Sequence, residues 1–416
     1  MNILIGISGG ISAYKIADLV RLFIKDGHKV KTVLTKNAQK FITPVTLETL
    51  SKERAYTDLF SDVKDVKHIE LSKWADILVL APATANTIAK IINGMCDDLL
   101  SSIVMAIDKP CYIFPSMNTN MFTHPATQAN IEKLRGWGYL VYEPDEGELA
   151  CGDTGKGRLP DVALIYDIVM GEIERAEIDS ILSDKKVIVT AGSTKAYIDP
   201  VRYIVNNSSG TMGVQIAREA WLRGANVSLV CNKEVVDNFP TVLYYADDVY
   251  IVETTDEAYE TINKIYDECE VYISAAAFCD FSSSPQAKKI KKSEISGSIF
   301  LKPAVDIFKE ISKRKKQQVM VGFALESDDM EDNAKSKLKE KNMDLVIANS
   351  IDAIGAKSSS VAIMDNKGIR TYIKDTDKKV IANSILIEIE RLFLEKHKDD
   401  KKEEKNEDNK EKTRNS

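Results

Sequence analysis

Polar residues suited to binding a small molecule follow an apolar run in the first third of the chain. Residues 111–114 are typical of a buried strand, and the polar segment 115–121, PSMNTNM, comes directly after it. Ligands of open α/β sheets bind at the carboxyl ends of strands, so Asn118 is a candidate hydrogen-bonding group and Met121 a soft apolar wall. A turn without a ligand fits the same residues.

Two more loops of this kind follow apolar runs. The loop after residues 2–7 contains Ser8, Gly9, Gly10 and Ser12, and the loop after residues 76–81 contains Thr84, Asn86 and Thr87. Backbone amides and hydroxyls at such helix starts favour a phosphate. The first loop has neither the GxGxxG spacing of dinucleotide sites nor a P-loop lysine, so a mononucleotide fits better. A tight turn that needs glycine is the alternative.

Few side chains can act as an acid or a base near neutral pH. Of the four histidines, His68 and His124 lie close to predicted strand ends, and either is a candidate base. Cys151 stands in the glycine-dense segment 149–160, which is typical of a mobile lid and makes the thiol a candidate proton donor. The pair Asp97-Asp98 favours a helix cap over a metal site.

The second half repeats the pattern. A glycine- and serine-rich loop, residues 206–213, precedes a predicted helix and is expected to hold phosphates. A basic run, Lys288 to Lys292, follows a strand end at Ser274–Ala277 and the carboxylate of Asp280. Cations there would neutralise a triphosphate, although an exposed charge run is the ordinary interpretation.

The elements that must position these groups alternate between strand and helix. In the first half, strands are predicted at 2–7, 29–34, 76–81, 110–114 and 138–142, with helices at 12–26, 84–93, 97–107 and 125–136. In the second half, strands are predicted at 187–190, 226–231, 270–274, 318–323 and 343–348, with helices at 208–223, 256–268, 303–316 and 330–341 and a hairpin at 361–372. This order predicts two successive three-layer α/β domains with mostly parallel sheets.

The length and composition of the chain limit the number of domains and the kinds of partner. The chain of 416 residues suggests two domains, at 1–178 and 185–396, joined by a linker at 179–184 and followed by a charged tail at 397–416 that is predicted to be disordered. A net charge of -7 argues against a nucleic-acid partner, and no apolar run reaches membrane-spanning length. The six cysteines form no CxxC pair, which favours a reducing, cytoplasmic setting and small-molecule partners.

Together these residues resemble the bifunctional flavoproteins of coenzyme A biosynthesis, which join a phosphopantothenoylcysteine decarboxylase to a phosphopantothenate–cysteine ligase. The resemblance covers roughly residues 1–395. It rests on SGGISAYK (8–15), His68 before WAD (74–76), APATANTIAK (81–90), PSMNTNM (115–121), ACGDTGKGR (150–158), IDPVRYIVNNSSGTMG (198–213) and KIKK (289–292).

The resemblance implies a flavodoxin-like first domain that binds FMN through Ser8, Gly9, Gly10, Ser12, Thr84, Asn86, Thr87 and Met121. It also implies that His68 is the catalytic base, that Asn118 grips the substrate carboxylate and that Cys151 donates a proton. By the same resemblance, FMN would take a hydride from the thiol-bearing carbon, and the resulting thioaldehyde would provide the electron sink for loss of CO₂. Return of the hydride then gives 4'-phosphopantetheine.

For the Rossmann-like second domain, the resemblance implies that the carboxylate of 4'-phosphopantothenate attacks CTP, with Mg²⁺, to give an acyl-cytidylate that cysteine displaces. Asn206 would hold this intermediate and Lys289 the triphosphate, although Lys288 can take the same role. The implied CTP site comprises Ser274, Ala275, Ala276, Asp280, Lys289, Phe323, Lys337 and Lys341. The family's decarboxylase trimers and ligase dimers imply a homo-oligomer that can reach a dodecamer.

The chain departs from the family pattern at Ala196, where an acidic residue is usual, at Cys279, where alanine is usual, and at Phe122, where Trp or Tyr is common. Two alternatives therefore stay open. One is a single-function flavin cysteine decarboxylase with a degenerate second half. The other is a non-enzymatic, flavin-binding regulatory subunit.

Overall fold

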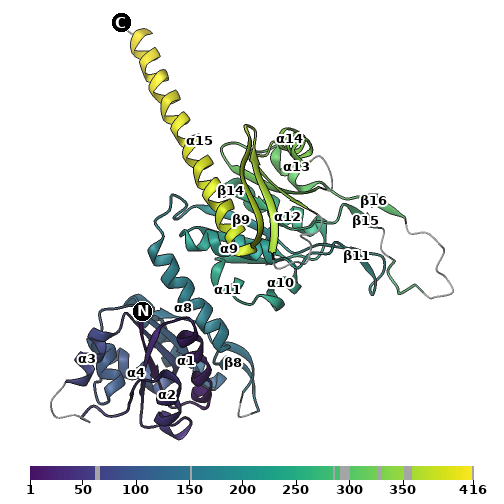
Figure 1. Cartoon of the computed structure of the whole chain (residues 1–416). Helices are drawn as coiled ribbons and strands as arrows, with labels where there is room; N and C mark the ends of the chain where they lie inside the picture. Colours follow the sequence, from purple (N-terminus) through teal and green to yellow (C-terminus); the bar gives the residue numbers. More distant parts are fainter. Residues whose placement is uncertain are drawn as a thin grey trace. The chain divides into compact units, whose positions relative to one another are not determined.

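The computed structural model describes residues 1–60, 66–149, 152–283, 286–290, 300–326, 330–350 and 358–414. The chain forms two compact units, residues 1–170 and 171–416, and helix α8 (Val162–Glu177) crosses from one to the other (Figure 1). The charged segment that begins at residue 172 is therefore the end of this helix. The linker predicted at 179–184 stays a prediction.

The first unit is built on a six-stranded parallel sheet. Its strand order is β3-β2-β1-β4-β5-β6, and its strands are β1 (Asn2–Ile7), β2 (Lys29–Leu34), β3 (Ala55–Tyr56), β4 (Ile77–Ala83), β5 (Cys111–Pro115) and β6 (Leu140–Val141). All residues of β4 and β5 are buried. Continuous burial of this kind is typical of a parallel sheet that is covered on both faces.

Helices flank this sheet and follow the predicted order. The described ones are η1 (Ile11–Lys15), α1 (Ile16–Lys25), η2 (Ala38–Lys40), α2 (Pro44–Ser51), α3 (Lys67–Trp74), α4 (Ala85–Ile92), α5 (Leu99–Ala106), α6 (Thr119–Phe122) and α7 (Pro125–Gly136). Helices α2, α3 and α6 were not predicted from the sequence. A start signal for α2 was present, because Thr43 caps the helix and Pro44 fills its first position.

The second unit contains an eight-stranded sheet with the order β13-β12-β9-β14-β17-β18-β19-β20. These strands are β9 (Lys186–Ala191), β12 (Asn226–Cys231), β13 (Asp248–Ile251), β14 (Val271–Ser274), β17 (Val319–Glu326), β18 (Leu345–Ser350), β19 (Ser358–Asp365) and β20 (Gly368–Asp377). The pairs up to β18 are parallel, and β19 and β20 add the predicted antiparallel hairpin.

Alternate residues of these strands face different cores. Val187 and Val189 pack in one hydrophobic cluster with residues of α9 (Thr211–Leu222) and α15 (Lys378–Arg414), whereas Ile188 packs in another with residues of α12 (Thr255–Ile265) and α13 (Ile307–Ser312). Both sheet faces are therefore covered, as a three-layer domain requires. The remaining helices of the unit are α10 (Lys233–Asn238), α11 (Val242–Tyr245), η3 (Tyr266–Glu268) and α14 (Met330–Glu340).

Helix α15 differs from the predicted tail. The composition predicts disorder from residue 397, whereas the helix continues to Arg414 (Figure 1). Its apolar residues Ile381, Ile385, Ile389 and Phe393 are buried in the core of the second unit. Beyond them, Lys and Glu are good helix formers, and a helix that is already nucleated extends at little cost.

None of the helices formed by the described residues combines the length and the apolar character needed to cross a lipid bilayer.

Candidate active sites

The strand order of each unit has a topological switch point. In the first sheet the chain runs from β1 to β2 on one side and returns to β4 on the other, so the order reverses between β1 and β4. In the second sheet the same reversal lies between β9 and β14. Ligands of open α/β sheets bind at such switch points, beyond the carboxyl ends of the strands.

In the first unit, hydrogen bonds of Ser8 link the loop after β1 to the loop after β4 at the switch point. Its buried hydroxyl donates to the carbonyl of Pro82 at 2.6 Å and accepts the N–H of Thr84 at 2.9 Å. The hydroxyls of Ser12 and Ser116 lie 3.0 Å apart and link the first loop to the loop after β5. The three polar loops that the sequence singled out therefore converge.

Gly10 lies where these loops meet. A Cβ atom on Gly10 would fill a space bounded by Pro82 and Thr84, each at 3.7 Å, and by the hydroxyl of Ser12 at 3.9 Å. The three nearest atoms belong to small side chains, two of which carry hydroxyl groups, and this cradle leaves room for the phosphate of a mononucleotide beside Gly10. The helix start differs from the prediction, because the five-residue 3₁₀ helix η1 precedes α1.

Thr84 caps α4, accepting the N–H of Thr87 at 3.4 Å, and Thr87 is buried. Asn86 and Met121 are exposed.

Asn118 is tied to a hairpin that the sequence analysis took for a loop. Strand β8 (Thr154–Arg158) lies within the predicted lid, residues 149–160, and pairs antiparallel with β7 (Asp145–Glu148), which directly precedes the lid. Met117 donates its N–H to the carbonyl of Gly157 at 2.9 Å, and the Asn118 side chain donates to Asp153 at 3.2 Å. The strand-end loop and the hairpin thus form one structure.

The two candidate bases, His68 and His124, have different surroundings in the structure. His124 caps α7 by accepting the N–H of Ala126 on Nδ1 at 3.2 Å, which gives this histidine a structural role. His68 is half-buried in the first turn of α3. Cys151 lies outside the described residues.

Asp98 caps α5, accepting the Ser101 N–H at 2.8 Å, and both Asp97 and Asp98 pair with Lys90. The prediction of a helix cap is confirmed for Asp98. Across the described part of the chain, no group of three or more His, Cys, Asp or Glu side chains is arranged to hold a metal ion. The five cysteines described are free thiols.

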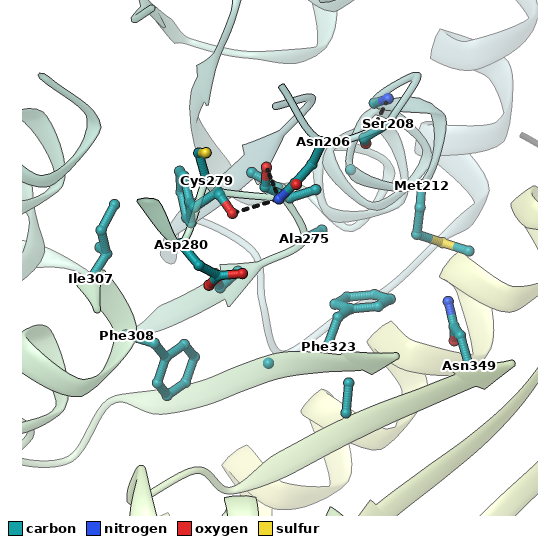
Figure 2. A pocket seen from close by; sticks show the side chains of 18 of the residues that line it. Asn206, Ser208, Met212, Ala275, Cys279, Asp280, Ile307, Phe308, Phe323 and Asn349 are labelled. Atoms are coloured by element: carbon teal, nitrogen blue, oxygen red, sulfur yellow. Dashed lines mark hydrogen bonds between the residues drawn. The ribbon is translucent and has the colours of Figure 1, made fainter. Parts of the chain in front are cut away.

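The second unit contains a cavity of about 640 Å³ at its switch point (Figure 2). Its walls come from the loop before α9, the segment after β14, the start of α13 and the middle of β17. Of the residues assigned from the sequence, it brings together Asn206, Ser274, Ala275, Ala276, Asp280, Phe323 and Lys341. Lys289 and Lys337 are not among its lining residues.

The loop before α9 is held close to the sheet. Gly210 caps the helix with a left-handed φ of 76°, and a Cβ on Gly213 would lie 2.7 Å from the carbonyl of Thr190. Glycine at these positions lets the helix N-terminus approach the end of β9. The side-chain amide of Asn206 donates to the carbonyl of Phe278 at 2.8 Å, which fixes the amide at the cavity wall (Figure 2).

The carboxylate of Asp199 holds the described part of the basic run, residues 288–290, in place. Its buried carboxylate accepts the N–H groups of Val201 and Arg202 at 2.9 Å and that of Ile290 at 3.2 Å, and it pairs with the Arg202 guanidinium. The hydrogen bond from Arg202 lowers the pKa of Asp199, burial opposes the shift, and the backbone N–H groups add to it. This carboxylate therefore holds the segment that contains Lys289.

Asp306 is a cavity residue that the sequence analysis missed. It caps α13 and forms an ion pair with Lys341 at 2.9 Å. Burial by itself raises the pKa of Asp306, but the hydrogen bonds from Lys341 and the Lys309 N–H outweigh it, so the pKa is lowered. The sequence signal was an Asp directly before an apolar helical run.

Two of the departures from the family pattern are buried. Ala196 is buried in β10 (Lys195–Tyr197) opposite Ile204 of β11 (Tyr203–Val205). Cys279 is buried beside Asp280, and its backbone donates to Thr194 at 2.8 Å and accepts from Thr255 at 3.2 Å. The fold accommodates both residues.

Family models match both halves of the chain. A model described as Flavoprotein matches residues 1–174, and one described as DNA/pantothenate metabolism flavoprotein C-terminal domain matches residues 182–393. The Coenzyme A biosynthesis bifunctional protein CoaBC of Bacillus subtilis (strain 168) is 37% identical over 398 residues, which is 94% of this chain and 97% of the relative. Its counterpart from Borreliella burgdorferi is 39% identical over 390 residues, 92% and 98% of the two chains.

Among solved structures, the C-terminal domain of a Coenzyme A biosynthesis bifunctional protein CoaBC is 29% identical and covers 51% of this chain and 98% of that one, with a TM-score of 0.43. A mutant PPC decarboxylase complexed with pantothenoylaminoethenethiol is 34% identical and covers 42% and 98%, with a TM-score of 0.38.

Proposed function

The chain belongs to the family of the coenzyme A biosynthesis bifunctional proteins, and from this premise we propose that its two units catalyse consecutive steps. The second unit joins cysteine to 4'-phosphopantothenate. The first unit decarboxylates the product, phosphopantothenoylcysteine, to 4'-phosphopantetheine. The observation that carries the proposal is the presence of a strand-end site at the switch point of both sheets, in a chain whose two halves match the family's two domains.

The cradle around Gly10 fits FMN. Ser8, Gly9, Gly10, Ser12, Thr84, Asn86, Thr87 and Met121 would hold the cofactor, with the hydroxyl and amide groups at its phosphate. When bound, FMN would accept a hydride from the thiol-bearing carbon of the substrate and later return it.

The protein's own groups would act around the cofactor. Asn118 would bind the substrate carboxylate, and its link to Asp153 keeps the side chain fixed beside the hairpin. His68 would take the proton from the substrate thiol, and Cys151 would supply the proton of the final reduction. The hairpin β7–β8, bonded to Met117, would help to exclude water from the site.

In the cavity of the second unit, we expect CTP to contact Ser274–Ala276, Asp280, Phe323 and Lys341. Lys289 and Lys337, which lie off the cavity wall, would reach the nucleotide from outside it. Asn206 would hold the acyl-cytidylate, because its fixed amide lies between the loop before α9 and the segment after β14.

Mg²⁺ is expected to bind together with the nucleotide. Asp280 and Asp306 supply two carboxylates at the cavity, and the described residues contain no group of three metal ligands. Mg²⁺ in nucleotide sites commonly uses one or two carboxylates together with substrate phosphates. The expected homo-oligomer and the cytoplasmic location stay predictions, and analytical ultracentrifugation would measure the former.

The test is to incubate the purified chain with 4'-phosphopantothenate, cysteine, CTP and Mg²⁺. We expect CMP, pyrophosphate, CO₂ and 4'-phosphopantetheine, together with the yellow absorption of a bound flavin. CO₂ release from added phosphopantothenoylcysteine without any CMP formation would support the single-function decarboxylase instead. A flavin band without turnover of either substrate would support the regulatory subunit.

A further inference from the structure

One end of the cavity in the second unit contains three polar residues that lie outside the set assigned to CTP. They are Asn349 near the end of β18, Ser359 at the start of β19 and Lys378, the first residue of α15. β18 pairs with β19, and Ser359 pairs with Thr376 of β20, directly before α15. The three residues therefore come from neighbouring elements at one side of the cavity.

Two of these residues have polar atoms without a partner. Ser359 is 5% exposed, and its hydroxyl makes no hydrogen bond in the described part of the chain; the same holds for the buried side-chain carbonyl oxygen of Asn349. Buried polar atoms are almost always hydrogen-bonded, and an orphan that lines a cavity indicates a missing partner. A ligand in the cavity can provide it.

Lys378 adds a positive charge at the same side of the cavity. It is half-buried, and within the described residues its ammonium forms no ion pair or hydrogen bond. The adjacent Asp377 carboxylate accepts the Lys379 N–H at 2.7 Å, and Lys379 itself pairs with Glu174 at 3.1 Å. Burial lowers the pKa of Lys378, and Asp377 opposes the shift. Lys378 is the first residue of α15, where the positive end of the helix dipole disfavours a cation. An anion bound there would be stabilised by the ammonium of Lys378 and by the helix dipole.

We propose that Lys378 and Ser359 form the subsite for the phosphate monoester of the acyl substrate, and that the carbonyl oxygen of Asn349 beside them accepts a hydrogen bond from a hydroxyl or amide N–H of the same substrate. This inference rests on the proposed ligase function. Figure 2 shows Asp280, Ile307 and Phe308 toward one end of the cavity and Met212 and Asn349 toward the other. If CTP occupies the end with Asp280, the acyl carboxylate meets it near Asn206, and the phosphate at the far end of the acyl substrate extends toward Lys378.

The test is to compare the KM values of the Lys378→Met variant and of the wild type for each substrate. We expect the KM for 4'-phosphopantothenate to rise about 10- to 100-fold, because a charge-assisted contact is lost. The KM values for CTP and cysteine should stay within about twofold. Turnover of pantothenate, which lacks the phosphate, should not fall in the variant, since the lost contact is to the phosphate alone. Lys379→Met is the matched control, because that neighbouring lysine is exposed and pairs with Glu174.

The variant Ser359→Ala provides a second test of the proposal. Removal of an unpartnered hydroxyl should leave the melting temperature of the free enzyme unchanged or higher, and yet raise the KM for 4'-phosphopantothenate severalfold. A rise in the KM for CTP or for cysteine, or no change in any KM, would overturn the proposal. If the wild-type chain forms no pyrophosphate, the ligase function fails, and a separate binding measurement with 4'-phosphopantothenate alone still tests whether Lys378→Met weakens the contact.

Discussion

At the scale of single residues, Asn118 joins two parts of the first unit through one amide. Its carbonyl oxygen accepts the Asn120 N–H at 2.8 Å, and its amino group donates to Asp153 at 3.2 Å. The donor is therefore fixed in direction, as a group that selects a carboxylate must be.

We predict that Asn118→Asp lowers the rate of decarboxylation at least about tenfold, because a second carboxylate beside Asp153 repels both that residue and the carboxylate of the substrate. The measurement is CO₂ release from phosphopantothenoylcysteine. Asn120→Asp, at an exposed position in α6 two residues further on, is the control and should retain activity. An undiminished rate in Asn118→Asp would remove the assigned role.

For Cys151, we predict that substitution by Ser separates the two halves of the decarboxylase reaction. CO₂ should still be released, while the yield of 4'-phosphopantetheine falls at least about tenfold, because a hydroxyl is a far weaker acid than a thiol. Mass spectrometry of the products measures both. Cys96→Ser, at an exposed free thiol, is the control. A normal yield from Cys151→Ser contradicts the prediction.

At the scale of elements, the hairpin β7–β8 depends on a glycine. Gly157 has a left-handed φ of 147°, and a Cβ there would lie 2.1 Å from the carbonyl of Met117. We predict that Gly157→Ala destabilises the first unit by about 2 kcal/mol or more and weakens flavin retention, because the contact with the Asn118 loop must open. Thermal unfolding and flavin absorbance measure the two effects. Gly136→Ala, where a Cβ meets nothing within 4 Å, should have neither effect.

The turn at Asp199 gives an element-scale prediction about pH. Its pKa is depressed in the folded state, so its contribution to stability is present above the unfolded pKa of about 3.9 and is lost as the pH falls from there toward the folded value. Asp199→Asn should therefore be less stable than the wild type at pH 7, and the difference should shrink below about pH 4. Denaturant unfolding across this range measures it.

The same variant should raise the KM for CTP, by about fivefold or more, because the segment that contains Lys289 loses its anchor at Ile290. A stability difference that grows as the pH falls, or a KM for cysteine that changes in place of that for CTP, would contradict this account.

At the scale of the whole molecule, two units with separate cores and separate switch-point sites predict separable activities. Asn206→Asp should reduce the formation of CMP and pyrophosphate at least about tenfold, because the amide that donates to Phe278 is lost. Decarboxylation of added phosphopantothenoylcysteine by the same variant should be unchanged. Asn118→Asp should show the reverse pattern, and loss of both activities in either variant would contradict the separation.

The sequence by itself predicted the alternation of strands and helices, the two-domain order and the polar loops at strand ends. These features depend on local physics: the period of apolar residues, glycines such as Gly210 at helix starts, and caps such as Asp98. Strand-end loops such as those of Ser8 and Thr84 were predictable for the same reason, because the carboxyl ends of the parallel strands β1 and β4 share one edge of the sheet.

Tertiary structure alone decided which residues meet across long sequence separations. The bond between Ser8 and Pro82, the pairing of Asp306 with Lys341 and the placement of Lys378 beside the cavity that contains Asn206 join residues far apart along the chain. No local pattern determines such contacts, because they depend on the strand order and register, which only the packing of the complete sheet fixes.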